Sequence, residues 1–537
     1  MGVLAAGAML MASAATTAQT MPSSPAPAEA PSVQEALAGL SVDQLRARLD
    51  SGRLTSERLV AALLTRVTLI DRNGPTLRSV IALNPNALAE AQAADARRRD
   101  GRRLGVLDGI PVLIKDNIET RDQPTTAGSL ALAANDTRRD APVVAALRAQ
   151  GAVILGKTNL SEWANIRSSA SISGWSAVGG LVRNPYALDR TACGSSSGSG
   201  AAVAAGLAPL ALGTETDGSV VCPAAMNGLV GLKPTLGLVS RTHVVPISHS
   251  QDTPGPMARS VREVAQLFGA MVASDPADPA TRNADRYRRD YAAQLRPDAL
   301  KGMRIGYWRP EMEAKLAARF DAALDQMRRA GAILVQVRPP EAKGLGEAES
   351  LVLHTELKAD LARYLATTPP TVKVRSLDDV IAFNAGHPTA EMPFFGQDVF
   401  LKAARTRGLD DPDYRAARVR AQRMAGPDGI DAMLRAADAQ ALVTPTYGTP
   451  WLSDPVHGDQ FTGPSASELP AVAGYPHLTV PMGLVDGLPV GLSFIGTAYS
   501  DGLLLNLGYA YEQISGARVA PRFLTTVPAD LGPRRGG

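Results

Sequence analysis

The sequence has few of the residues that build metal sites and disulfide frameworks. It contains two cysteines, Cys193 and Cys222, and six histidines in 537 residues. Two cysteines are too few for a disulfide framework, no CxxC pair is present, and no histidine has the HExxH spacing. We therefore predict a protein without a metal centre. An oxidising compartment would permit a Cys193–Cys222 bridge, but two buried free thiols are the preferred interpretation.

Cofactor and nucleic-acid signatures are absent as well. No GxGxxG follows an apolar strand, and there is no Walker lysine motif. The formal net charge of +3 is too close to balance for a nucleic-acid-binding protein. These absences predict that the protein uses no cofactor and has no nucleic-acid partner.

The N-terminal segment lacks basic residues, because the first one in the chain is Arg46. Val3 to Ala15 is nevertheless a run of small apolar residues, and Ala12-Ser13-Ala14 resembles a cleavage site for an export signal. The run is too short to span a bilayer. We expect a signal peptide at residues 1–18 and a Pro/Ala-rich spacer at 19–35. The mature protein would then be periplasmic or secreted, without membrane insertion.

The remainder of the chain has a globular composition, with 45% hydrophobic and 20% charged residues. Ile110 to Ile114 and Ala152 to Leu155 are short apolar runs typical of buried strands, and Val143 to Ala149 between them has a helical pattern. Such alternation favours an α/β fold with a largely parallel or mixed central sheet. A mostly helical stretch covers about 340–440. No interdomain linker follows the spacer, so residues 36–537 are predicted to form one domain.

A glycine- and serine-rich stretch, CGSSSGSGAAVAAG, begins at Cys193. Its residues 194–198 fit the pattern G-x-S-x-G, in which Ser196 would be the nucleophile of a strand–turn–helix elbow. The preceding residues, NPYALDRTAC, are rich in turn formers and do not read as a strand. The elbow interpretation therefore lacks its structural context, and a turn without chemistry remains an alternative.

A second serine downstream is better placed for catalysis. Ser199 to Ala208 is predicted to be a helix and Leu210 to Thr214 a strand that runs back. A helix of this length advances roughly 15 Å and the strand returns roughly 16 Å, so Ser219 comes level with Ser195. The tight turn Asp217-Gly218 can direct successive backbone N–H groups at one point, which is the arrangement that an oxyanion requires.

A lysine is a candidate base for such a serine. Lys115 directly follows the apolar run GIPVLI, and burial at the end of a strand would favour its neutral form. The alternative is a lysine that reaches solvent beside Asp116, and these residues alone do not decide between the two. Lys157 and Lys233 are further candidates.

Three segments together, GIPVLIKDN, CGSSSGSGAAVAAG and LGTETDGSVVCPAAMNGLVGLKP, resemble the amidase signature family. The similarity continues through SQDTPGPMARSV and VTPTYGTP to LTVPMGLVDGLPVGLSFIG, so it covers nearly all of the chain after the leader. The resemblance implies an α/β/α sandwich whose large mixed central sheet is covered by helices.

The resemblance also implies a Ser-cis-Ser-Lys catalytic triad. Ser219 would be the nucleophile, Ser195 the bridging serine after a cis Gly194–Ser195 peptide bond, and Lys115 the base. The oxyanion hole would be formed by backbone N–H groups, namely those of Thr216, Asp217, Gly218 and Ser219. Ser196 and Ser197 are expected to form hydrogen bonds within the loop, and Ser199 to start the helix.

Some positions depart from the family pattern. Asp217 stands where many relatives have glycine, and we expect its carboxylate to turn away from the oxyanion. Relatives that bind a carboxylated substrate often have arginine at the positions of Val221 and Cys222, so a neutral peptide C-terminal amide is the favoured substrate. This also argues against the glutamine-hydrolysing subunit of a transamidosome. Trp175 would line the substrate cleft or pack in the core.

Three other functions remain open. The protein could be an amidase for small aliphatic or aryl amides, a catalytically inactive binding protein on an amidase scaffold, or a serine protease or esterase that uses Ser196 with a histidine. The amide substrate is the only partner we expect, and we expect the protein to be a monomer.

Overall fold

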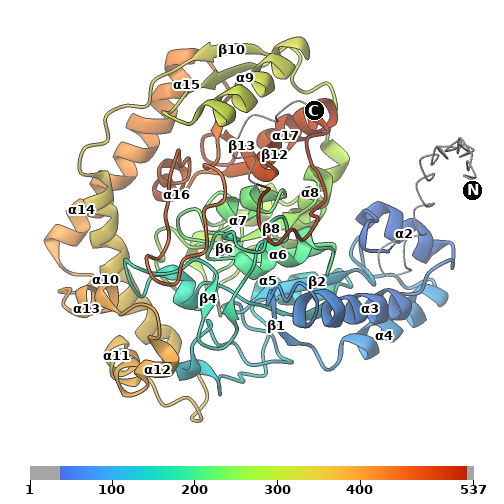
Figure 1. Ribbon diagram of the computed structural model, residues 1–537, viewed down its shortest axis with the longest axis vertical. Coiled ribbons are helices and arrows are strands. Elements are labelled where there is room, and N and C mark those ends of the chain that lie inside the picture. The colour runs from blue at the N-terminus through green and yellow to red at the C-terminus, as the bar shows by residue number, and fades with distance from the viewer. Residues whose placement is uncertain (1–36, 529–537) are drawn as a thin grey trace, which may run out of the picture.

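A large mixed β-sheet runs through the centre of the molecule (Figure 1). The computed structural model describes residues 37–528, so the expected signal peptide and spacer lie outside the described residues. Within this part of the chain the sheet has 11 strands, in the order β1-β3-β2-β6-β8-β7-β12-β13-β11-β9-β10. Helices flank the sheet, which confirms the fold class expected from the sequence.

The strand bounds agree with the short apolar runs of the sequence. The sheet consists of β1 (Val80–Leu83), β2 (Pro111–Lys115), β3 (Val153–Thr158), β6 (Leu210–Glu215), β7 (Val230–Lys233), β8 (Thr253–Ala258), β9 (Arg304–Tyr307), β10 (Ile333–Gln336), β11 (Ala441–Pro445), β12 (His477–Val485) and β13 (Leu488–Ile495). A separate two-stranded sheet pairs β4 (Trp175–Ser176) with β5 (Gly180–Leu181).

Parallel pairing of three strands positions the chemistry. β2 pairs in parallel with both β3 and β6, and its Ile114 lies opposite Leu212 of β6. Parallel strands end at the same edge of a sheet. Lys115, the last residue of β2, therefore lies beside the C-terminal end of β6, from which the chain continues to Ser219.

Helices cover both faces of the sheet. The helices of the described chain include α2 (Val42–Asp50), α3 (Ser56–Arg66), α4 (Ala87–Arg99), α5 (Pro142–Ala149), α6 (Ser197–Ala204), α7 (Val221–Met226), α8 (Val261–Met271), α9 (Ala314–Arg329), α10 (Leu345–Leu365), α11 (Leu377–Gly386), α12 (Pro388–Glu391), α13 (Asp398–Ala404), α14 (Pro412–Ala425), α15 (Asp431–Ala437), α16 (Glu468–Ala473) and α17 (Asp501–Ser515). Short 3₁₀ and π turns lie between them.

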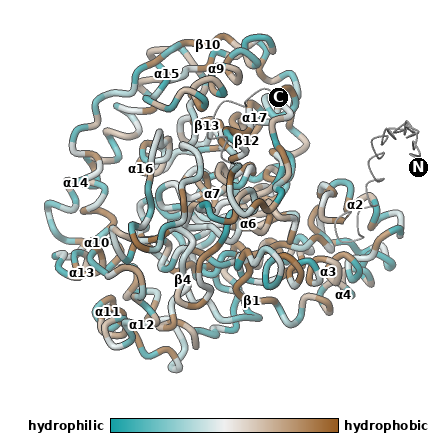
Figure 2. The backbone as a smooth tube through the Cα atoms, viewed as in Figure 1, coloured by the Kyte–Doolittle hydropathy of each residue, from teal (hydrophilic) through white to brown (hydrophobic). Residues whose placement is uncertain are grey.

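Successive side chains of β12 contact helices on opposite faces of the sheet. Leu478 and Val480 contact Gly508 of α17, whereas Thr479 faces Gly491 together with Ala225 of α7. Successive side chains of a strand point to opposite faces, so α17 and α7 cover opposite sides. The hydrophobic segments gather around the sheet in the middle of the molecule (Figure 2).

The helical stretch expected at about 340–440 is present as α10 to α15. It forms one side of the molecule, with α10, α13 and α14 at the left of Figure 1. Leu345, Ala348 and Val352 of α10 pack against Tyr414 and Ala417 of α14 in a separate hydrophobic cluster. Within residues 37–528, none of the helices has the length and hydrophobicity that crossing a membrane requires.

Candidate active site

Lys115 is completely buried at the end of β2 and faces a serine of the glycine-rich loop. Its Nζ lies 2.7 Å from Ser195 Oγ, 2.8 Å from Thr214 Oγ1 and 3.3 Å from the Thr214 carbonyl oxygen. Burial lowers the pKa of the amine to about 7, although the carboxylates of Asp252 and Glu215 oppose this shift. Three partners satisfy this nitrogen in either protonation state: an ammonium donates to all three, and a neutral amine donates to two and accepts from the third.

The other buried lysines bind elsewhere. Lys157 pairs with Asp116 at 3.0 Å and donates to Thr125 Oγ1, while Lys233 donates to the Pro234 carbonyl oxygen. Among the fully buried lysines of the described chain, Lys115 is the one with a hydrogen bond to a serine of the glycine-rich loop. The sequence left open whether Lys115 is buried or reaches solvent, and the structure shows that it is buried.

The glycine-rich loop adopts the backbone that the family resemblance implies, with a cis peptide bond between Gly194 and Ser195. Gly198 is required by close packing, because a Cβ there would lie 2.3 Å from the Ser79 carbonyl oxygen and 2.4 Å from that of Asn159. Ser197 Oγ donates to the Cys193 carbonyl oxygen, within the loop as expected. Ser196 instead binds β6: its Oγ donates to the Thr214 carbonyl oxygen and accepts from the Thr214 N–H.

The helix after the loop differs from the prediction at both ends. We expected it at Ser199 to Ala208, whereas α6 spans Ser197–Ala204. It stops early because Gly206 adopts the left-handed conformation, with φ +70°, which is a common helix terminus. The chain leaves the helix before Ala208 and continues through Pro209 into β6.

Ser219 lies beside this loop, as the lengths of helix and strand predict. The Ser196 N–H donates to the Ser219 carbonyl oxygen at 3.1 Å, which joins the two segments. Gly218 has φ +77°, so the turn before Ser219 needs glycine. Glu215 Oε2 accepts from the N–H groups of Val220 and Val221, which fixes the start of α7 directly after the turn. Among the described residues, Ser219 Oγ has no hydrogen-bond partner.

Three backbone donors of this turn are unoccupied. No hydrogen bond within residues 37–528 uses the N–H groups of Thr216, Asp217 or Ser219, whereas the Gly218 N–H lies near the Glu215 carboxylate. Burial raises the pKa of the Asp217 carboxyl to about 6, and its Oδ1 has no hydrogen-bond partner. The expected oxyanion donors thus remain a prediction that fits the free N–H groups of this turn.

A cavity of about 280 Å³ opens in front of Ser219. Its base is formed by Cys193, Gly194, Thr216, Asp217, Ser219 and Cys222. Tyr447, Trp451 and Phe461 form an aromatic wall in which Phe461 packs edge-on against the other two rings. The remaining lining includes Ile166, Ile247, Leu353, Asn165 and Asp459, with no lysine or arginine. A larger cavity, of about 530 Å³, lies around Arg241, His249 and Asp360, and none of Lys115, Ser195 and Ser219 lines it.

The two cysteines are joined, which corrects the preference for free thiols. Cys193 and Cys222 form a disulfide with their Cα atoms 5.9 Å apart. One cysteine precedes the glycine-rich loop and the other follows Ser219, so the approach of these two segments brings the sulfurs together. This proximity arises from the fold, and the residue types alone do not reveal it.

Removing this disulfide should destabilise the protein. The two cysteines are 29 residues apart, and a loop of that length gives a loss of about 3–4 kcal/mol in the free energy of unfolding. The double variant Cys193→Ser/Cys222→Ser should show this loss in urea titrations, with oxidised wild-type protein as the reference. An unchanged free energy of unfolding would contradict a bridge in the native protein.

The remaining candidates have structural contacts. Trp175 is buried against Phe394, Phe395 and Arg167 and does not line the cavity at Ser219, so its role in substrate binding stays a prediction. Ser196 is fully buried and bound to backbone groups, and no histidine contact with it or with Ser219 is found in residues 37–528. The elbow alternative is therefore unsupported.

One group of side chains in the described part of the chain has the spacing of metal ligands, namely His249, Glu356 and Asp360. The Glu356 carboxylate already accepts hydrogen bonds from Ser248, Ser250 and Tyr414. Hydroxyl and backbone donors thus occupy the oxygens that a metal ion would need. We assign this group to the network that holds residues 248–250.

The geometry above agrees with the comparisons to known proteins. A family model described as Amidase matches residues 58–505. The chain belongs to the amidase family. A crystal structure of native peptide amidase from Stenotrophomonas maltophilia is 52% identical to this amidase and superimposes with a TM-score of 0.87, covering 90% of this chain and 99% of that one.

Curated sequences extend the similarity to other amidases. A protein of Arabidopsis thaliana described as a probable amidase is 38% identical over 505 residues, covering 92% of each chain. A glutamyl-tRNA(Gln) amidotransferase chain of Chloroflexus aurantiacus is 36% identical over 510 residues, which cover 89% of this chain and 96% of that one. This amidase is thus similar both to peptide amidase and to amidotransferase chains.

Proposed function

We propose that this amidase removes the C-terminal amide of peptides through an acyl-enzyme formed on Ser219. The observation that carries the proposal is the buried hydrogen bond between Lys115 Nζ and Ser195 Oγ, next to a cavity that contains Ser219. The 52% identity to a peptide amidase supports the choice of substrate.

In the proposed mechanism the proton moves along a two-step relay. Neutral Lys115 accepts the proton of Ser195, and Ser195 accepts that of Ser219 as Ser219 Oγ attacks the carboxamide carbon. The oxyanion is stabilised by the free backbone N–H groups of Thr216, Asp217 and Ser219. The proton then returns along the relay to the leaving nitrogen, ammonia departs, and a water molecule, deprotonated by the same relay, hydrolyses the acyl-enzyme.

The cavity chemistry favours a neutral substrate. Asp217 and Asp459 line it, and no basic side chain is available to bind a substrate carboxylate. Val221 and Cys222 are uncharged, whereas relatives that bind carboxylated substrates often have arginine at these positions. Repulsion from Asp217 and Asp459 would also favour release of the peptide acid that the reaction produces.

The alternative substrates, small aliphatic or aryl amides, are separated from peptide amides by a rate comparison. The aromatic wall of Tyr447, Trp451 and Phe461 offers apolar area that a peptide side chain can cover and propionamide cannot. We expect kcat/KM for an N-blocked dipeptide amide to exceed that for propionamide by at least about 100-fold, since roughly 3 kcal/mol of contacts gives this ratio. Equal values would favour the small-amide alternative, and absence of turnover on both would favour an inactive scaffold.

We further propose that the protein is exported and acts as a monomer. The disulfide supports export, because such bonds persist in oxidising compartments. N-terminal sequencing of the protein from its native source tests the cleavage of the leader, and light scattering tests the monomer.

A further inference from the structure

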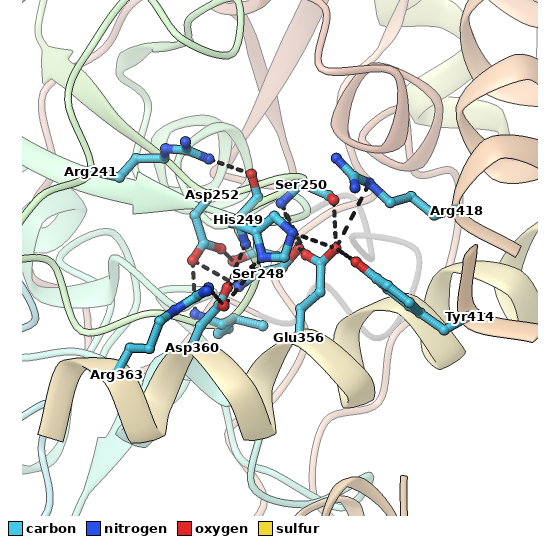
Figure 3. A network of polar contacts seen from close by, with 12 residues as sticks. Arg241, Ser248, His249, Ser250, Asp252, Glu356, Asp360, Arg363, Tyr414 and Arg418 are labelled. Atoms are coloured by element: carbon cyan, nitrogen blue, oxygen red, sulfur yellow. Dashed lines mark hydrogen bonds and ion pairs between the residues drawn. The ribbon is translucent and has the colours of Figure 1, made fainter. Parts of the chain in front are cut away.

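Helix α10 binds a loop, residues 248–250, that leads to residues in contact with the turn at 216–219. We call residues 216–219 the catalytic turn. Figure 3 shows Ser248, His249 and Ser250 held by carboxylates of this helix. Ser250 Oγ donates to Glu356 Oε1 at 2.6 Å, and His249 Nδ1 lies 2.9 Å from Asp360 Oδ2. Tyr414 of α14 donates to the same Glu356 oxygen at 2.6 Å. The loop is thereby fixed to the helical side of the molecule.

Gln251 and Asp252, which follow this loop, both contact Thr216 in the catalytic turn. Asp252 Oδ1 accepts from Thr216 Oγ1 at 2.6 Å. Gln251 Nε2 lies 3.2 Å from the Thr216 carbonyl oxygen and 2.8 Å from Oε1 of Glu349, which belongs to α10. Gln251 therefore donates to both groups and links the helix to the turn.

This link fixes the orientation of one oxyanion donor. The carbonyl of Thr216 and the N–H of Asp217 belong to the same planar peptide unit and point in opposite directions. A hydrogen bond that holds the Thr216 carbonyl toward Gln251 thus keeps the Asp217 N–H directed away from Gln251. That N–H has no hydrogen-bond partner in the described chain.

The Glu349 carboxyl is buried beside two other acidic groups. It is 8% exposed, and the charged groups that face it are Asp217 of the catalytic turn and Glu468 of α16. Arg418 of α14 faces Glu356 and not Glu349. Glu356 lies two turns after Glu349 in α10. Burial, with the repulsion from Asp217 and Glu468, raises the pKa of Glu349 to about 8. This shift favours the protonated carboxyl near pH 7.

We propose that the carboxyl of Glu349 is a positioning group for the oxyanion hole: it fixes Gln251, and Gln251 fixes the peptide unit between Thr216 and Asp217. The proposal rests on the proposed function of residues 216–219. A neutral carboxyl supplies the acceptor that Gln251 needs without adding a negative charge behind a developing oxyanion. An ionised Glu349 would keep the hydrogen bond but oppose that charge.

The expected consequence is an alkaline decline of activity that belongs to Glu349. In the wild-type enzyme, kcat for a peptide amide should fall above about pH 8, as Glu349 ionises. The isosteric variant Glu349→Gln should keep kcat at pH 7 within about twofold and lose this decline. Glu349→Leu removes the acceptor, so kcat should fall at least about tenfold with KM unchanged, because small displacements of catalytic groups have such effects.

The control variant is Glu347→Gln, an exposed acid on the same helix, which should behave as the wild type. Circular dichroism confirms that each variant is folded. An unchanged alkaline decline in Glu349→Gln, or a wild-type kcat in Glu349→Leu, would overturn the proposal.

A spectroscopic measurement separates this proposal from the proposed function. Infrared difference spectra between pH 7 and pH 9 should contain a protonated-carboxyl band that is missing in Glu349→Gln. This readout does not depend on turnover, so the neutral carboxyl can be established or excluded even for an enzyme inactive on peptide amides. Absence of the band from the wild-type spectra would overturn the role of Glu349 alone.

Discussion

Ser219→Ala is expected to lower kcat for ammonia release from a peptide amide roughly 10⁵–10⁶-fold. The reason is that no other hydroxyl takes its place. Ser219 lines the cavity, and its Oγ is not engaged by any described residue. Ser195 and Ser196 next to it are completely buried and hydrogen-bonded to Lys115 and to the backbone of Thr214. Ammonia release is measured directly with a coupled enzymatic assay.

Two further variants make this result specific. Ser195→Ala breaks the relay between Lys115 and Ser219 and should reduce kcat by several orders of magnitude. Ser196→Ala removes two hydrogen bonds to the Thr214 backbone and should cost stability more than activity. If activity disappeared in Ser196→Ala and persisted in Ser219→Ala, the elbow alternative would be correct.

The acyl-enzyme can also be observed. A peptide ester or activated amide mixed briefly with the wild-type enzyme and quenched in acid should increase the mass of the peptide that contains Ser219. The same treatment of Ser219→Ala should give no adduct. An adduct on Ser196 or on any other residue would remove Ser219 from the role of nucleophile.

The sequence predicts the core of this site because its determinants are local. Lys115 follows a buried strand, and the strand that begins at Leu210 returns the chain to the level of Ser195. The lengths of these elements suffice to bring Ser219 there, even though α6 ends at Ala204 and not at Ala208. The wrong helix end does not change the predicted position of Ser219, because the chain after Gly206 still enters β6 and returns to the same edge of the sheet.

The parts that the sequence does not predict depend on contacts between distant segments. The Cys193–Cys222 bridge forms because the glycine-rich loop meets the start of α7, and spacing alone cannot distinguish this from two separate buried thiols. The contact of Gln251 with Glu349 joins residues of different elements, and the glutamate resembles any other acid on a helical stretch. Its burial, which raises the pKa of its carboxyl, depends on where α10 lies relative to residues 216–219 and is not visible in the sequence.

The second large effect is expected for Lys115, which can act as the base only when its amine is neutral. Lys115→Ala should lower kcat by roughly 10²–10⁴-fold, the usual contribution of a positioned general base. Lys115→Met preserves more of the side-chain volume and should show the same loss, which separates the missing amine from a packing defect. Lys315→Met, at an exposed lysine, is the control and should retain full activity.

The pH dependence distinguishes a base from a merely structural lysine. Because burial lowers the pKa of Lys115 to about 7, the amine is protonated below this value and neutral above it. The wild-type kcat/KM should therefore rise with pH through about 7, and fall about tenfold per pH unit on the acid side. In Lys115→Ala this acid limb should vanish, and small primary amines added to the buffer should restore part of the activity by entering the space that the side chain leaves. The restored rate should follow the concentration of the neutral amine. A wild-type optimum in the acid range, where Lys115 carries its proton, is incompatible with the proposed relay.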